Sequence, residues 1–488
     1  MKKTIILFIG VCLICLGILN ENKKENNELY NADVINKEKN TLSMMLETEF
    51  NSGKYEETTG SSWPAEGYLF NSTLSKCKNG SSLSWDNDKK QVIFEGNTKD
   101  DCYVYFDVVI SLANYVKQLY TGTQGENNLY LHDNTLENGA NDGSYRYAGA
   151  EYILTDLGKK DDTTSIFAKK SNDTSSLINY YCNDSKTIYH YCSKSFYFKL
   201  KNEDIKYNSF SEVISKAISL GFIKSNQVTN FVCFGYSSNN GECPSDNLYR
   251  IIGIFDNNVK LIKYDYAKAS LLGTDGGFDK YYSSTSFSNT QWVNIGSNSE
   301  NEIGSYKWNN DDRNTWSTSL LNTVNLNKHF LNNIGENWSN KIVSHIWQVG
   351  GNTTDNIYNV VPSVAYTKEI TTPATNTTYE SKVGLMYVSD YGYAMLPDLW
   401  SYNPGFYGDL SLVSENWMYM GLTEWTITPN TKYDSSTFYI FPTGAIGNTN
   451  VFSERVIFSR ALRPTFYLNS NVTYVSGSGT KTEPIIIK

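Results

Sequence analysis

The sequence predicts a β-rich α+β protein that is exported from the cytoplasm and contains more than one domain. Its 488 residues suffice for two to four domains at about 100–200 residues each. Aromatic residues make up 14% of the chain and include 37 tyrosines, which is typical of β-rich extracellular domains with folded cores. The net charge is −9 and no basic cluster is present, so we expect no nucleic-acid partner.

The N-terminus has the pattern of an export signal. Lys2 and Lys3 precede an apolar run over 4–19, which predicts either a signal peptide or a membrane anchor. The run is shorter than the ~20 residues that comfortably span a bilayer, and no small-residue cleavage site follows it. Both alternatives stay open, and both place the protein at the cell surface or outside the cell. The Asn-, Lys- and Glu-rich residues 20–40 predict a flexible stalk.

Six regions follow from the order of apolar runs and polar stretches. They are a signal peptide or anchor (1–19), a stalk (20–40), a small β module (41–107), a helix and loop connector with an insertion (108–244), a large final domain (245–476) and a C-terminal tail strand (477–488). The small module is expected from four short β-prone runs, at 67–70, 82–85, 91–94 and 102–106.

Helices are expected where apolar residues recur at helical spacing. The connector contains one such segment, 111–122, and its insertion contains a second, 209–222. In the final domain, apolar residues recur at i+4 within 314–335, and Gly335 predicts the end of that helix.

The final domain also contains the strongest strand signals. The segment 248–266 reads as a β-hairpin, with two apolar runs around an Asp/Asn turn. Strands are further expected at 343–350 and 382–389. His345 shares strand parity with Trp347, which predicts a half-buried histidine with satisfied hydrogen bonds.

Cysteine usage agrees with export. Two of the eight cysteines lie in the N-terminal apolar run, and the other six form three pairs that are local in sequence. The simplest pairing joins Cys77 to Cys102, Cys182 to Cys192 and Cys233 to Cys243. Metal ligation is the alternative, but there is no C-x-x-C motif and no histidine at ligand spacing. We therefore expect disulfides, no metal and no cofactor.

Residues 245–470 resemble bacterial C-type lectin-like domains. "GLTEWT" (421–426) approximates the G-x-x-x-E-W-T signature of the formylglycine-generating-enzyme-like branch. "WSTSLLNTVNLNKHF" (316–330) and "ALRPTFYL" (461–468) are similar to segments of a surface-protein family of gut bacteria. The variable proteins of diversity-generating retroelements use the same fold. The resemblance implies a C-type lectin-like fold for 245–476 and a role in ligand display.

Two departures from these families bear on chemistry. The enzymatic branch holds copper with a late cysteine pair, and this chain has no cysteine after Cys243. The Glu-Pro-Asn and Gln-Pro-Asp triplets of sugar-binding animal lectins are also absent. "WNNDD" (308–312) is similar to a calcium motif in letters alone, and we interpret it as a solvated loop.

The stretch "WMYMGLTEWTITPN" (417–430) combines residues that we expect to brace a surface. Trp417 and Trp425 predict core anchors, with ligand stacking as the alternative. Gly421 and Glu424 are interpreted as structural, and Arg463 as capping a loop or pairing with Glu424. A general-acid role for Glu424 is the alternative, but the sequence names no second catalytic group.

The segment 428–459 is rich in Tyr, Phe, Ser, Thr and Asn, the composition of adaptable binding loops. The predicted ligand-binding residues are Tyr433, Ser435, Ser436, Tyr439, Thr443, Asn448 and Asn450. We expect a non-catalytic adhesin or display protein that recognises a protein or glycan. An exported carbohydrate-active hydrolase with a carboxylate pair and a structural cell-envelope protein are the alternatives.

Overall fold

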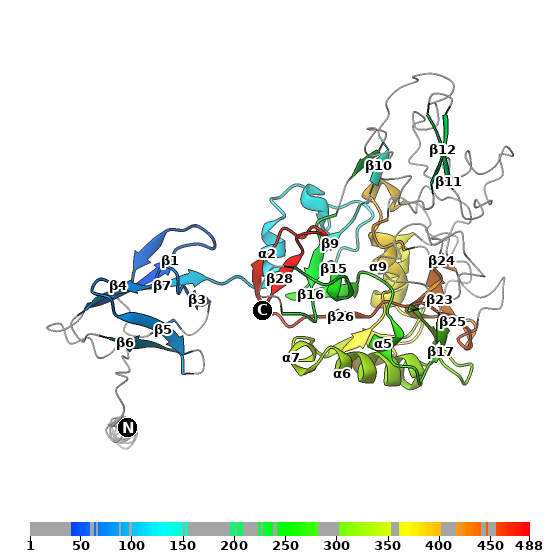
Figure 1. The fold of residues 1–488 in the computed structure, drawn as a ribbon. Coiled ribbons are helices and arrows are strands. Elements are labelled where there is room, and N and C mark those ends of the chain that lie inside the picture. Colours follow the sequence, from blue (N-terminus) through cyan, green and yellow to red (C-terminus); the bar gives the residue numbers. More distant parts are fainter. Residues whose placement is uncertain are drawn as a thin grey trace, which may run out of the picture. The chain divides into compact units, whose positions relative to one another are not determined.

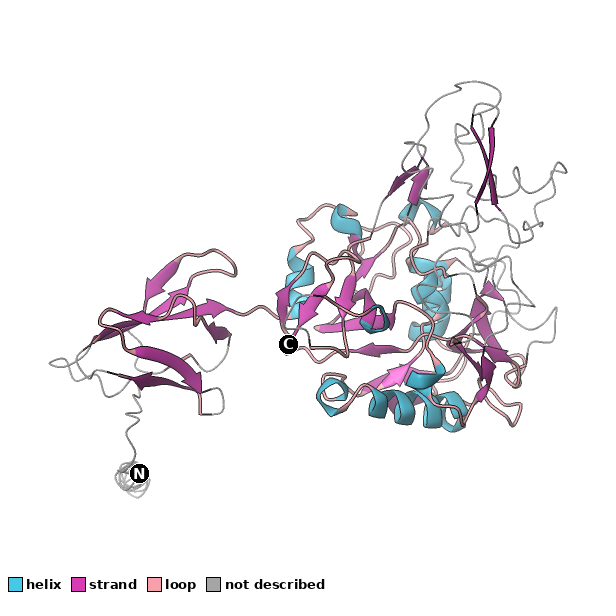
Figure 2. Ribbon diagram, in the orientation of Figure 1, coloured by secondary structure: helices cyan, strands magenta, loops and turns pink. Residues whose placement is uncertain are grey.

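The structure is a computed structural model in which two compact units, Met1–Ile110 and Ser111–Lys488, are distinguished (Figure 1). It describes residues 41–58, 63–64, 67–86, 89–96, 100–149, 152–154, 196–200, 203–207, 223–225, 228–237, 242–281, 302–352, 361–401, 416–420, 422–440, 446–447 and 455–488. The expected signal or anchor, the stalk and the helix at 209–222 lie outside these residues. The fold is β-rich with short helices (Figure 2). No helix in the described ranges is long and apolar enough to cross a membrane.

The first unit contains a five-stranded sheet in the order β2-β1-β7-β3, with β4 also paired to β7. These strands are β1 (Thr41–Glu47), β2 (Tyr55–Glu57), β3 (Tyr68–Phe70), β4 (Lys76–Cys77) and β7 (Asp101–Val108). A hairpin of β5 (Ser82–Asp86) and β6 (Gln91–Glu95) accompanies the sheet. The four predicted strands of the module are confirmed, whereas β1, β2 and β4 were not anticipated.

The core of the first unit follows from alternation along β7. Val104 and Phe106 are buried, while their neighbours in the strand are half-buried, as expected for a sheet with one apolar face. Val92 of the hairpin and Met44 of β1 join the same cluster. The rings of Trp85 and Phe106 meet edge to face, with centroids 5.3 Å apart, a favoured aromatic geometry.

Two of the three predicted cysteine pairs are disulfides. Cys77–Cys102 joins β4 to β7, and Cys233–Cys243 closes a short loop in the second unit. The third predicted pair, Cys182 and Cys192, lies outside the described residues.

The second unit is built on a nine-stranded sheet. Its path is β21-β26-β16-β15-β14-β28-β27, with β9 paired to β15 and β8 to β9. The strands are β8 (Leu129–Leu131), β9 (Tyr145–Tyr147), β14 (Phe231–Cys233), β15 (Leu248–Phe255), β16 (Asn258–Lys263), β21 (Val383–Gly384), β26 (Thr465–Tyr467), β27 (Tyr474–Ser476) and β28 (Ile485–Ile487). Strands β8, β9 and β14 come from 108–244, so this part of the chain contributes to the same sheet as the final domain.

The predicted hairpin at 248–266 is confirmed as β15 and β16. Seven of the eight residues of β15 are buried, including Arg250, which explains why the strand is apolar on both faces apart from this arginine. Asp256 in the turn has φ of 56°, a backbone conformation that Asp and Asn tolerate better than most residues.

Helices and smaller sheets surround the nine-stranded sheet (Figure 2). The α-helices are α2 (Leu112–Gln118), α5 (Ala269–Leu272), α6 (Leu331–Asn333), α7 (Glu336–Ser339), α8 (Pro362–Tyr366) and α9 (Val388–Tyr393). The 3-10 helices are η3 (Glu126–Asn128), η4 (Ser245–Asn247), η6 (Trp316–Thr318) and η10 (Pro397–Leu399), and the π-helices are η7 (Leu321–Phe330) and η9 (Thr367–Thr371). The helices predicted at 111–122 and 314–335 are thus confirmed. Ser111 caps α2, because its Oγ accepts the Asn114 N–H at 3.2 Å.

The smaller sheets of the second unit contain two or three strands each. They are β17 (Phe278–Tyr281), β18 (Gly304–Lys307) and β25 (Ser459–Arg460); β22 (Glu424–Pro429), β23 (Thr437–Ile440) and β24 (Ile446–Gly447); β19 (His345–Gln348) and β20 (Thr378–Ser381); β10 (Tyr152–Leu154) and β13 (Ile223–Ser225); and β11 (Phe196–Leu200) and β12 (Glu203–Tyr207). Strand β19 confirms the strand predicted at 343–350.

The strand predicted over 382–389 is wrong beyond its start. Only Val383–Gly384 pairs as β21, and α9 begins at Val388. Asp390 Oδ2 accepts the Tyr387 N–H at 2.8 Å, which caps the helix. A short apolar run does not distinguish a strand from a buried helix, and here the cap decides between them.

A buried ion pair joins α9 to the nine-stranded sheet beside His345. Lys260 Nζ of β16 lies 2.6 Å from Asp390 Oδ2, and both side chains are at most 2% exposed. The half-buried His345 ring stacks on Tyr467, with centroids 3.9 Å apart. Burial, assisted by the positive charge of Lys260 and opposed by Asp390, lowers the pKa of His345 to about 4.

We predict that His345→Phe weakens the acid sensitivity of the protein. Unfolded histidine has a pKa of ~6.5, so between pH ~6.5 and 4 the unfolded chain binds the extra proton and the folded chain does not. The free energy of unfolding should therefore fall by as much as ~3 kcal/mol as the pH is lowered through this range. Urea denaturation at pH 7 and at pH 4 should show a smaller fall in the variant, which retains an aromatic ring against Tyr467. An equal fall in both proteins would contradict the assignment.

Candidate ligand-binding surface

Trp417 and Trp425 are buried anchors in the second unit. Trp417 Nε1 donates to the carbonyl oxygen of Tyr147 at 2.8 Å, and the Arg250 guanidinium lies 4.5 Å from the Trp417 ring. Trp425 is fully buried, and its Nε1 donates to the carbonyl oxygen of Tyr306 at 2.8 Å. Both indole N–H groups are satisfied by backbone, so neither ring is offered to a ligand.

Glu424 and Arg463 form a buried ion pair with two contacts between the guanidinium and the carboxylate. Arg463 Nε lies 2.7 Å from Glu424 Oε1, and Arg463 Nη2 lies 2.9 Å from Glu424 Oε2. Nη2 also donates to the carbonyl oxygen of Met418 at 2.7 Å. Burial raises the pKa of Glu424, and the positive charge of Arg463 opposes this rise. Both carboxylate oxygens are engaged and the side chain is 3% exposed, an arrangement that suits a structural role better than a general acid.

The predicted ligand-binding residues divide into exposed and buried ones. Tyr433 is 37% exposed and Ser435 is half-buried, whereas Ser436 and Tyr439 are 4% and 1% exposed. Ser436 and Tyr439 are therefore not available to a surface ligand. Ser436 directly precedes β23, and the ring centroids of Tyr439 and Trp425 lie 6.1 Å apart. The remaining candidates, Thr443, Asn448 and Asn450, lie outside the described residues, as does Gly421.

The loop 430–436, which joins β22 to β23, is held in one shape by a distant asparagine. Asn314 Nδ2 lies 2.8, 3.1 and 2.6 Å from the carbonyl oxygens of Asn430, Tyr433 and Ser436. The Asn314 backbone N–H donates to the carbonyl oxygen of Asp434 at 2.6 Å. One residue thus fixes the loop at four points, which reduces the conformational entropy that a ligand would otherwise have to remove.

A second segment, 455–460, lies beside the loop. The Val456 N–H donates to the carbonyl oxygen of Ser435 at 2.9 Å, and Phe458 is 42% exposed. We call the exposed side chains of residues 431–434 together with Phe458 the binding face. Each part presents one exposed aromatic ring, Tyr433 or Phe458, on backbone that is hydrogen-bonded to the other part.

Arg455 fastens the segment 455–460 to the "WNNDD" stretch. Its Nε lies 2.7 Å from Asp312 Oδ1, and its Nη2 contacts the second carboxylate oxygen. Trp308 and Asn309 at the start of the stretch are buried. Asn310 and Asp311 are exposed and Asp312 is half-buried, so the stretch is the exposed loop that the sequence suggested, with a buried start that the sequence did not reveal.

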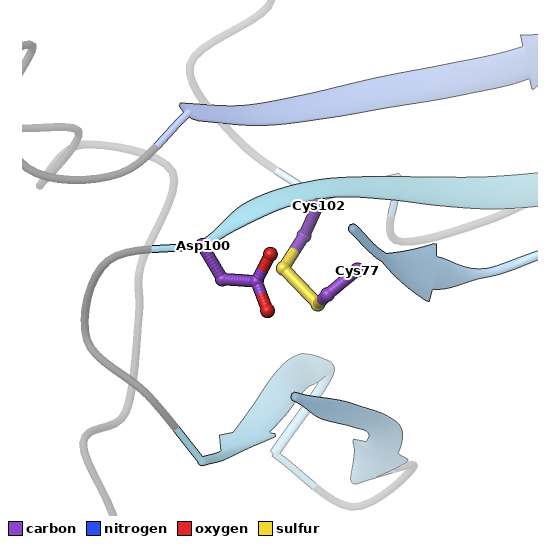
Figure 3. Close-up of side chains that lie close together, drawn as sticks. All are labelled: Cys77, Asp100 and Cys102. Atoms are coloured by element: carbon purple, nitrogen blue, oxygen red, sulfur yellow. A yellow bond between two sulfur atoms is a disulfide. The ribbon is translucent and has the colours of Figure 1, made fainter. Parts of the chain in front are cut away.

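One group in the first unit has metal-ligand composition, namely Cys77, Asp100 and Cys102 (Figure 3). Its two sulfur atoms form the Cys77–Cys102 disulfide, so no thiolate is offered. Asp100 Oδ1 and Oδ2 accept the N–H groups of Asn79 and Ser81 at 2.7 and 3.1 Å. The group is therefore a disulfide with a backbone-binding carboxylate beside it.

A pocket of about 230 Å³ in the second unit is lined by Asp246, Lys263, Lys268 and Asn333, among others. Lys263 is buried and donates to the carbonyl oxygen of Asp246 at 3.0 Å, and burial lowers its pKa to about 8. Lys268 Nζ lies 2.9 Å from Asp246 Oδ2. Both lysine ammonium groups contact oxygen atoms of Asp246, so the charges lining the pocket do not indicate a ligand class.

Several supports of the binding face were missed at the level of sequence. Asn314 and Asn352 contact the loop from 116 and 79 residues away in sequence, and no short motif marks them. Thr431 Oγ1, for example, donates to the carbonyl oxygen of Asn352 at 2.7 Å. Such pairings depend on the fold and leave no local signal in the chain.

Comparison of the chain with protein-family models, with curated proteins and with solved structures gives no match. The resemblance to C-type lectin-like domains accordingly stays a prediction, and the function is argued from the surface itself.

We predict that Arg463→Met and Arg455→Met differ widely in their effect on stability. Removing Arg463 leaves Glu424 buried without its partner, which typically costs ~3–5 kcal/mol. Arg455 is the matched control, because its pair with Asp312 is partly exposed, at 49% and 25%, and such pairs contribute at most ~1 kcal/mol. Chemical denaturation measures both variants, and similar losses would contradict the structural role of the buried pair.

Proposed function

We propose that this protein is a non-catalytic extracellular ligand-binding protein, an adhesin or display protein, whose binding face recognises a protein or glycan. The observation that carries the proposal is an exposed tyrosine, Tyr433, on a loop that Asn314 fixes at four backbone points. Binding residues are commonly found on loops that a rigid scaffold positions.

The chemistry of the face supports this class of ligand. Tyr433 and Phe458 are apolar rings open to solvent, and aromatic rings provide large contact area at low entropic cost. Asp434 adds an exposed carboxylate residue beside Tyr433. A glycan uses rings for stacking and polar groups for hydrogen bonds, and a protein epitope uses the same combination.

The hydrolase alternative needs a pair of carboxylates that a substrate can reach. Glu369 and Asp390 interact electrostatically, and burial raises the pKa of Glu369 to about 7. Both are at most 2% exposed. Glu369 accepts the N–H groups of Val388 and Ser389 at 3.0 and 2.9 Å. These engaged carboxylates favour binding over hydrolysis as the proposal for this chain.

We predict that Tyr433→Ser combined with Phe458→Ser abolishes ligand capture and preserves the fold. Loss of central aromatic contacts typically costs ~2 kcal/mol or more, roughly a 30-fold loss of affinity. The measurement is binding of the full chain to a printed glycan array and to immobilised host-cell surface proteins. Circular dichroism and thermal melting check the fold.

Tyr236→Ser is the matched control, because Tyr236 is 43% exposed and lies outside the binding face. It should bind as the wild type does. Unchanged capture by the double variant would refute the face. Capture by neither the wild type nor any variant would favour the structural cell-envelope protein, and turnover of an array glycan would favour the hydrolase.

A further inference from the structure

The first and last strands that the structure describes in the first unit, β1 and β7, lie side by side and run parallel. Their register comprises six residue pairs, from Thr41 opposite Asp101 to Leu46 opposite Phe106. The chain enters β1 at Thr41 and leaves β7 after Val108. The two points at which the rest of the chain pulls on this sheet are thus at opposite ends of the two-strand ladder.

This arrangement decides how tension acts on the sheet. A pull on the chain before Thr41 and an opposite pull on the chain after Val108 slide the two strands past each other along their length. The hydrogen bonds of a parallel ladder are evenly spaced, so all of them resist the slide together. A pull on two ends at the same side of the ladder would instead break the pairs one after another.

The end of the ladder is reinforced by Glu47. Its Oε2 accepts the Val108 N–H at 3.0 Å, and its Oε1 accepts the Gly53 N–H at 2.9 Å. The side chain is 5% exposed, so water competes little for these charge-assisted bonds. Met44 and Val104, which face each other in the register, are buried in the core beneath the ladder.

The disulfide limits how far the unit can lengthen after the ladder breaks. Cys77 and Cys102 are 25 residues apart in sequence, and the segment between them is withheld from extension while the bond is intact. At ~3.5 Å per residue, this segment corresponds to ~90 Å of chain.

We propose that the first unit is a mechanical spacer, in which the parallel β1–β7 ladder is loaded in shear and resists tension along the chain. This function is distinct from ligand recognition. It concerns residues on the N-terminal side of the binding face, and its test needs no ligand.

The first measurement stretches the full chain in optical tweezers with handles at its two termini. The rupture of the first unit is identified by its length, because reduction of Cys77–Cys102 should add ~90 Å to that step. Reduction of Cys233–Cys243, ten residues apart, should add only ~35 Å to a step of the second unit.

The decisive comparison moves one handle from the C-terminus to Asp101. Asp101 is opposite Thr41 in the register and its side chain is 44% exposed, so the same ladder is now peeled open from one end. We expect the first unit to break at a several-fold lower force in this direction. Equal forces in the two directions would overturn the proposal.

Two variants test whether the β1–β7 ladder, rather than the overall stability of the unit, sets the rupture force. The Thr58 N–H donates to the Met44 carbonyl oxygen on the β2 side, so the backbone groups of the neighbour Ser43 point to β7. Ser43→Pro should lower the force of the termini-loaded rupture, with Ser43→Ala as its control. Glu47→Gln tests the same ladder if the proline variant does not fold, since it keeps the shape and removes the charge. A termini-loaded rupture force that neither variant lowers would count against the ladder as the resisting element.

Discussion

The buried ion pair between Arg463 and Glu424 connects the two parts of the second unit on which the binding face depends. Arg463 lies two residues before β26 of the nine-stranded sheet, and Glu424 begins β22 of the small sheet whose strands β22 and β23 flank the loop. The Trp425 N–H also donates to the carbonyl oxygen of Ala461 at 3.1 Å. A buried arginine and carboxylate are expensive to separate, so the loop region is fixed to the large sheet.

Above this connection, the binding face is supported mostly by backbone carbonyl groups that accept from side chains. Asn314 donates to carbonyl oxygens of the loop, Arg455 donates to the Asp312 carboxylate, and Trp308 in the same stretch as Asp312 is fully buried. The polar atoms of the loop backbone are used within the protein, while the rings of Tyr433 and Phe458 face solvent. This division gives a preformed surface, which lowers the entropy lost on binding.

The two units are stabilised in different ways. The second unit buries charged groups such as Lys260 with Asp390, and the lowered pKa of the neighbouring His345 couples its stability to pH. The first unit has a small core and supplements it with a disulfide and a terminal parallel ladder. A small domain gains little from burial alone, and the disulfide adds a covalent link between β4 and β7.

Local chemistry in the sequence by itself determined the β-rich class, two disulfide pairs, the 248–266 hairpin and the helix within 111–122. Alternation, turn residues and caps act over a few positions, so one chain suffices to find them. The tertiary structure alone decided that Tyr439 is buried and Tyr433 exposed, because all four residues of β23 are buried and Tyr433 lies in the loop that precedes it. It alone brought Asn314 to the loop and β1 beside β7, since contacts between distant segments leave no periodic trace in the residues that make them.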